Sequence, residues 1–92
     1  MTNNYVVNLQ YCVSWNYWER AARVADDILK NYQQVIETFT FITGSKGVFE
    51  LEVDGHLLFS KKALGRHAEP GEVFTLFQDF VGPDTPVYPQ NS

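Results

Sequence analysis

The single cysteine of this 92-residue chain, Cys12, is its clearest candidate for chemistry. It lies in the stretch Tyr11-Cys12-Val13-Ser14-Trp15, after an extended apolar run and before an amphipathic pattern that begins near Asn16. Unpaired backbone N–H groups at the start of a helix favour the thiolate, which is the nucleophilic form of cysteine. We therefore predict Cys12 as the catalytic residue, if the protein is an enzyme.

Cys12 could serve in three different ways. As a single-thiol redox centre it would form a mixed disulfide with glutathione or a protein partner, and an external thiol would resolve that disulfide. As a peroxide sensor it would form a sulfenic acid. As a small buried hydrophobe it would be inert.

A candidate binding face follows the cysteine and consists of Val13, Ser14 and Trp15. Large aromatic side chains near a site often anchor a protein partner. Ordinary local packing is the alternative interpretation of Trp15 and Tyr17. Trp18, in contrast, has the helical spacing of a core residue.

The composition narrows the class of protein. Hydrophobic residues make up 45% of the chain and aromatic residues 15%, which is enough for one folded domain. The formal charge of −4 argues against a nucleic-acid partner. One cysteine excludes an intramolecular disulfide, and no apolar run is long enough for a membrane span. The N-terminus lacks the features of a secretory signal, so we expect a cytoplasmic protein.

Three elements surround Cys12. Alternating apolar residues predict a strand over 5–11, and three- and four-residue apolar spacing predicts a helix from Asn16 to Tyr32. Residues 35–42 are β-branched and aromatic with one charge, which predicts a largely buried strand. A strand, helix and strand in this order form a βαβ unit with parallel strands. Cys12 then lies at the carboxyl end of a parallel strand, where sites in such sheets tend to form.

The predicted first helix has candidate N-terminal capping residues and oppositely charged side chains at helical spacing. Either Ser14 or Asn16 can cap it, and Asn16 with Glu19 resembles a capping box. Two oppositely charged pairs lie four residues apart on its polar side: Glu19 with Arg23, and Asp26 with Lys30.

The second half predicts a hairpin and a second helix. Strands over 48–53 and 56–60 flank Asp54-Gly55, a strong hairpin signal. A polar connection over 61–69 then leads to a helix that begins at Pro70 and ends at Val81. Residues 82–92 look like an untethered, flexible tail. Lys61, Lys62 and Arg66 form a small basic spot, which is either a site for glutathione carboxylates or, as such clusters more often are, solvated charge at the end of a strand. His56 and His67 do not have zinc-ligand spacing.

These elements predict one α/β (two-layer α+β) domain over 1–92 with its core at about 5–81. A βαβ unit followed by a ββα unit gives a mixed four-stranded sheet with two helices on one or both faces, which is the thioredoxin-like arrangement. The redox site of that fold lies in the turn after the first strand, where Cys12 occurs.

Two segments of the chain resemble the selenoprotein W-like (Rdx) family. One is residues 11–15 followed by Glu19-Arg20-Ala21, and the other is Gly47-Val48-Phe49-Glu50-Leu51-Glu52-Val53-Asp54-Gly55-His56-Leu57-Leu58-Phe59-Ser60-Lys61-Lys62. The resemblance covers about residues 5–81. It implies a thioredoxin-like fold, thiol redox homeostasis, glutathione and protein partners.

The sequence departs from that family at one central position. Family members carry Cys-x-x-Cys or Cys-x-x-selenocysteine, and the second redox residue aligns with Trp15 here. Tryptophan cannot resolve a mixed disulfide, so dithiol reductase activity is not expected. We therefore expect a single-cysteine redox-linked or protein-binding module. The alternative is a glutathione-dependent monothiol oxidoreductase with Cys12 as nucleophile. The oligomeric state does not follow from the sequence.

Overall fold

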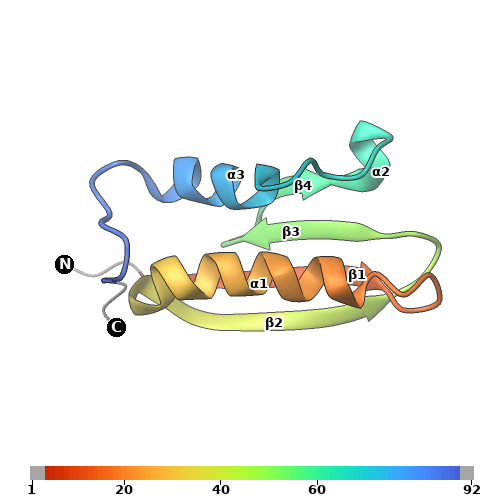
Figure 1. Cartoon of the computed structure of the whole chain (residues 1–92), viewed down its shortest axis with the longest axis horizontal. Coiled ribbons are helices and arrows are strands. Elements are labelled where there is room, and N and C mark those ends of the chain that lie inside the picture. The colour runs from red at the N-terminus through yellow and green to blue at the C-terminus, as the bar shows by residue number, and fades with distance from the viewer. Residues whose placement is uncertain (1–3, 90–92) are drawn as a thin grey trace.

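The computed structural model describes residues 4–89 and contains a mixed four-stranded sheet with helices (Figure 1). Its elements are β1 (Tyr5–Cys12), α1 (Trp18–Tyr32), the 3₁₀ turn η1 (Gln33–Val35), β2 (Ile36–Gly44), β3 (Phe49–Val53), β4 (His56–Ser60), α2 (Lys61–Leu64) and α3 (Glu72–Val81). The strand order is β2-β1-β3-β4. β1 and β2 are parallel, and the other two pairings are antiparallel. The predicted fold class is confirmed.

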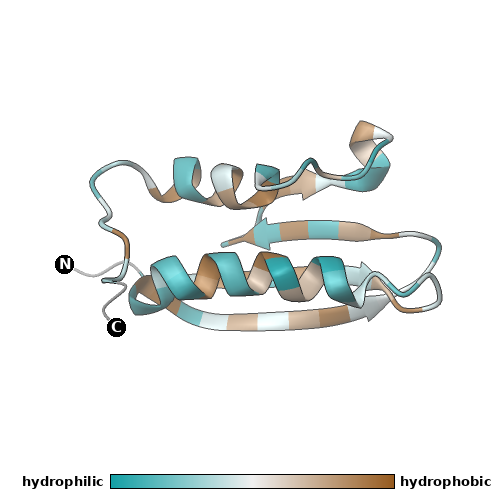
Figure 2. Ribbon diagram, in the orientation of Figure 1, coloured by the Kyte–Doolittle hydropathy of each residue, from teal (hydrophilic) through white to brown (hydrophobic). Residues whose placement is uncertain are grey.

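The sheet and its two longer helices form two layers. α1 packs on β1 and β2, while α3 packs on β4 and beside α1, so the core lies between one face of the sheet and the helices. Alternation along β1 and β3 produces this arrangement, and Figure 2 shows it on β3 as alternating apolar and polar residues. The buried residues on that face include Val7, Leu9, Leu51, Val53, Ala21, Ile28 and Phe77.

The second strand differs from its prediction. β2 was expected to be largely buried, but it is an edge strand and most of its residues are exposed. β-branched and aromatic residues suit interior and edge strands alike, so composition alone does not give the position of a strand in the sheet.

The ends of the helices also differ from the expected ones. α1 begins at Trp18 without a side-chain cap, because Asn16 has φ 57° and belongs to the preceding turn. The connection over 61–69 contains the short helix α2, whose first turn is capped by Ser60 Oγ accepting from the N–H of Ala63 at 3.2 Å. α3 begins at Glu72, so Pro70 lies before the helix and not in its first turn.

The segment after α3 is held against the rest of the domain as far as Tyr88. The Tyr88 N–H donates to the Asn31 carbonyl at 2.6 Å, and the Gln34 side chain donates to the Pro86 carbonyl at 2.8 Å. The expectation of an untethered tail is therefore wrong for this portion, and residues 90–92 lie outside the described range.

Candidate functional site

Cys12 is the last residue of β1 and lies beside Gly44 at the end of β2. The chain then turns through residues 13–17 before α1 starts. The N–H of Asn16 donates to the Val13 carbonyl at 2.9 Å, and the N–H of Tyr17 donates to the Cys12 carbonyl at 3.0 Å. The carboxyl-end position of the cysteine agrees with the prediction, but this turn separates it from the start of α1.

The groups that surround the thiol belong to loops. Cys12 Sγ lies 3.4 Å from Ser14 Oγ. Burial acts to raise the pKa of the Cys12 thiol, but the Ser14 hydroxyl and the backbone N–H groups of Gly47, Trp15 and Ser14 together outweigh it, so the pKa is lowered from its ordinary 9.0. The predicted source of stabilisation, the N-terminus of α1, is thus replaced by a set of turn amides and a hydroxyl. The chemical consequence, a favoured thiolate, is the same.

The thiol has no exposed surface, yet it lies outside the main hydrophobic cluster of the domain. Trp15 lies close to it through Gly47. Gly47 is buried and has φ +75°, and a Cβ placed on it would be 2.4 Å from Trp15 Cζ3. The indole therefore rests directly on the Gly47 backbone, whose N–H interacts with the sulfur.

Trp15 nevertheless remains 58% exposed. Its ring meets Tyr17 edge-on at 6.2 Å, and Lys61 Nζ lies 5.9 Å from the ring centroid. Val13 is also exposed, at 53%. The three residues predicted as a binding face, Val13, Ser14 and Trp15, are all exposed and directly follow the buried Cys12 in the chain.

The other tryptophan is not where its spacing placed it. Trp18 was expected in the core but is 46% exposed, and its ring packs on Tyr11 and Phe41 at centroid distances of 5.7 and 5.1 Å. It is the first residue of α1 and lies with Ala22 and Leu29 on the side of the helix that lines a groove toward β2. Tyr17 is half-buried and meets the His67 ring edge-on at 5.0 Å.

The predicted basic spot is divided in the structure. Arg66 makes two hydrogen bonds to the Glu72 carboxylate, at 2.8 and 2.9 Å, and the Glu69 N–H donates a third at 2.8 Å. The guanidinium and this N–H together lower the pKa of Glu72 to about 2. Lys61 instead lies over the rings of Trp15 and Tyr17. Within residues 4–89, Lys61 is therefore the cation of this group that lies over the aromatic residues following Cys12.

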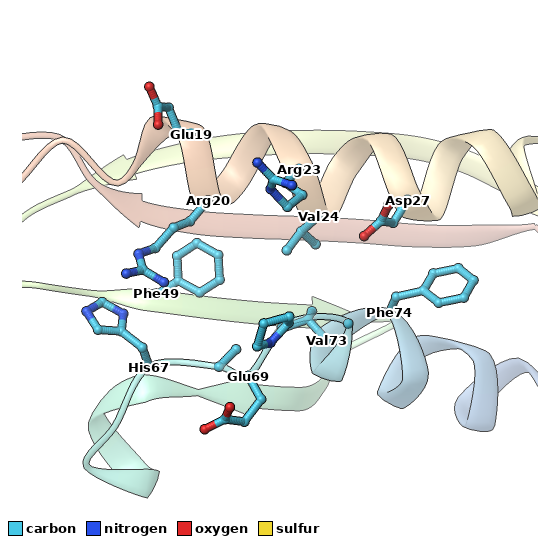
Figure 3. A pocket seen from close by; sticks show the side chains of 13 residues that line it. Glu19, Arg20, Arg23, Val24, Asp27, Phe49, His67, Glu69, Val73 and Phe74 are labelled. Carbon is cyan, nitrogen blue, oxygen red and sulfur yellow. The ribbon is translucent and has the colours of Figure 1, made fainter.

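A cleft of about 420 Å³ between α1 and the segment 67–74 was not predicted from the sequence (Figure 3). Arg20, Arg23 and His67 line one part of it, and Phe49 lies between the two sides. Burial lowers the pKa of His67, and the positive charges of Arg20 and Lys61 lower it further. The cleft could not be found by local patterns, because its walls are about fifty residues apart in sequence.

Residues 4–89 contain neither a metal-binding cluster nor a membrane-spanning helix. No group of three or more His, Cys, Asp and Glu side chains is arranged to hold a metal ion in this range. None of the helices described is both long enough and apolar enough to cross a membrane.

Comparison with known proteins decides the family. The sequence profile of the Rdx family matches residues 6–79. The chain belongs to the Rdx family. Solved structures with the same fold include a selenoprotein W-related protein from Vibrio cholerae, with a TM-score of 0.77 and 22% identity over 86% of this chain and 99% of the other.

A protein from Bordetella parapertussis is similar at a TM-score of 0.75 and 22% identity, over 83% of this chain and 96% of its own. The search of curated proteins gave no match. Family and fold together make this Rdx chain a thioredoxin-like, redox-related protein.

Proposed function

We propose that this Rdx protein is a single-cysteine redox module, in which Cys12 forms a mixed disulfide with a protein that docks on Val13, Ser14 and Trp15. The observation that carries the proposal is the set of donors around one sulfur: the Ser14 hydroxyl at 3.4 Å and three backbone N–H groups. Each of them stabilises negative charge on sulfur and none requires a second thiol.

The chemistry is thiol–disulfide exchange. The Cys12 thiolate attacks one sulfur of a partner disulfide, a new S–S bond forms, and the other partner sulfur leaves as a thiolate. Since Trp15 stands where a resolving thiol would be, an external thiol must attack the mixed disulfide and release the Cys12 thiolate. That attack leaves the external thiol in a disulfide with the partner sulfur. A second external thiol attacks this disulfide, so that the partner leaves as a thiolate and the two external thiols are joined. The two electrons that reduce the partner disulfide therefore come from two external thiols, and Cys12 is regenerated. A reducing compartment rich in glutathione supplies such thiols, and we propose the cytoplasm as the location.

Access to the sulfur is the step that calls for a protein partner. Cys12 is fully buried, and the Trp15 indole rests on the glycine next to it. A partner that takes up the exposed Trp15 and Val13 side chains would draw the indole away from Gly47 and open a path to the thiol. Aromatic anchors of this kind contribute much of the binding energy at protein interfaces.

The test compares two disulfides as substrates for Cys12. One is glutathione disulfide, and the other is a disulfide-linked peptide with aromatic and aliphatic residues beside its cysteine. We expect the apolar peptide to form the mixed disulfide faster, and Cys12→Ser to form none. Val13→Ser should remove the preference for the peptide, because it deletes half of the apolar docking face.

Leu64→Ser is the matched control, since Leu64 is exposed to the same degree, at 52%, but lies on α2. It should leave the preference unchanged. Equal rates for both disulfides in the wild type, or a preference that survives Val13→Ser, would contradict docking on this face.

One observation favours the glutathione-dependent monothiol oxidoreductase as a second candidate. Lys61 Nζ lies 5.9 Å from the rings of both Trp15 and Tyr17, where a glutathione carboxylate would find a cation. Insulin reduction with glutathione supplied tests this directly. Turnover that is lost in Cys12→Ser and reduced in Lys61→Gln would support it, and equal rates for wild type and Cys12→Ser would exclude it.

A further inference from the structure

The edge strand β2 lacks the residues that usually protect an exposed sheet edge. Its nine residues, Ile36–Gly44, carry one charge, Glu37, and no proline or lysine. Exposed edge strands usually carry several charged residues, a proline or a bulge, because their unpaired N–H and C=O groups otherwise pair readily with another strand. The only register shift between β1 and β2 lies at their first residues, and no strand among residues 4–89 pairs with the outer side of β2.

An apolar groove runs beside this edge. Trp18 and Phe41 are 46% and 37% exposed, and their rings are 5.1 Å apart. Together with Ala22, Ala25 and Leu29 of α1 they line the apolar part of a groove of about 600 Å³ between the helix and β2, and the rest of its lining is Asp26, Lys30 and Gln33. Figure 1 shows β2 at the margin of the molecule with α1 set inward from it, so the helix does not cover the strand edge.

We propose that a second copy of this chain covers the edge, with the two β2 strands antiparallel about a twofold axis at Thr40. The two four-stranded sheets then form one eight-stranded sheet with the helices of both copies on the same face. A twofold contact must be self-complementary, and this strand meets that condition.

The sequence of residue types along β2 favours a second copy as the occupant, because it is self-complementary about Thr40. On the helix side, Phe39 of each strand lies opposite Phe41 of the other, an aromatic pair of the kind that stabilises antiparallel strands. Glu37 lies opposite Thr43, so no like charges meet. On the open face, Thr38 lies opposite Ile42. The apolar grooves of the two copies adjoin, which removes Trp18 and Phe41 from water.

The test uses Thr40, which is exposed and lies opposite itself at the axis. Sedimentation of the wild type over a wide concentration range should show a monomer that converts to a dimer. Thr40→Glu places two carboxylates in contact and should weaken dimerisation at least tenfold. Thr75→Glu, an exposed threonine on α3, should dimerise like the wild type.

A cross-link distinguishes this register from other contacts. On a Cys12→Ser background, Thr40→Cys should oxidise to a covalent dimer, because directly opposed residues in antiparallel strands are within disulfide reach. Thr75→Cys on the same background should remain largely monomeric. A wild type that stays monomeric at every concentration overturns the proposal, as does equal cross-linking of the two cysteine variants. Circular dichroism of each variant confirms that it is folded.

Discussion

Replacing Gly47 with alanine perturbs the contact on which the geometry of the site depends. The new Cβ would lie 2.4 Å from Trp15 Cζ3, whereas two carbon atoms normally approach to about 3.5–4.0 Å. The indole must therefore move away from Gly47. Because the ring is exposed on its other side, it can swing outward without disturbing the core.

The size of the effect follows from two contributions. Alanine at the left-handed φ of +75° costs about 1–2 kcal/mol. Trp15 is 58% exposed, so displacing it uncovers at most about 100 Å² of aromatic surface, or about 2.5 kcal/mol at 25 cal/mol per Å². We expect Gly47→Ala to lower the free energy of unfolding by about 2–4 kcal/mol, and the melting temperature by about 10–20 °C.

Gly65→Ala is the matched control, because Gly65 has a similar φ of +73° and nothing within 4 Å of an added Cβ. It should lose only about 1–2 kcal/mol. The two variants should also differ in the rate at which Cys12 is alkylated at high pH, where the thiol is ionised in both. Gly47→Ala should react at least about tenfold faster than wild type, as expected if the indole limits access. Equal stability and equal alkylation of the two variants would refute this account of Trp15.

Two further predictions concern ionisation. At pH values below the pKa of the thiol, Ser14→Ala should lower the Cys12 thiolate fraction about tenfold. Because the more basic thiolate is about threefold more nucleophilic, the alkylation rate at those pH values should fall about threefold. Ser45→Ala, in the neighbouring loop, should not change the pH profile of alkylation, and an unshifted profile in Ser14→Ala would contradict the role of the hydroxyl. Because the Arg66 guanidinium and the Glu69 N–H lower the pKa of Glu72 from 4.5 to about 2, these interactions stabilise the fold above pH 4.5, and that stabilisation disappears as the pH falls toward 2. Chemical denaturation at several pH values should show Glu72→Gln less stable than wild type near neutral pH and equal to it near pH 2, and a difference that is the same at every pH would exclude this linkage.

Local patterns were sufficient for the elements that bury one face. Alternation in β1 and β3 gave the correct inward residues, such as Leu9 and Leu51, because only one register buries them. Asp54-Gly55 gave the hairpin, since both residues adopt the positive φ that its turn requires. The position of Cys12 at the end of β1 followed from the same alternation.

Features that depend on how distant segments pack together could not be predicted from local sequence patterns. Strand order places β2 at the edge, and nothing within residues 36–44 encodes that order. Because residues 13–17 form a turn, α1 begins at Trp18 and not near Asn16. Trp18 is therefore outside the core, and the helix N-terminus is not next to Cys12. The backbone N–H of Gly47 interacts with Cys12 although Gly47 lies thirty-five residues later in the chain. The spacing of residues near Cys12 in the sequence does not predict this contact.

The most direct test of the central claim is an ultraviolet titration of the Cys12 thiolate, with the Cys12→Ser spectrum subtracted at each pH to remove the tyrosine signal. The loop amides and the Ser14 hydroxyl predict a midpoint below the ordinary thiol pKa of 9.0. A midpoint at or above 9.0 would mean that burial dominates at this sulfur, and the proposed redox role of Cys12 would be wrong.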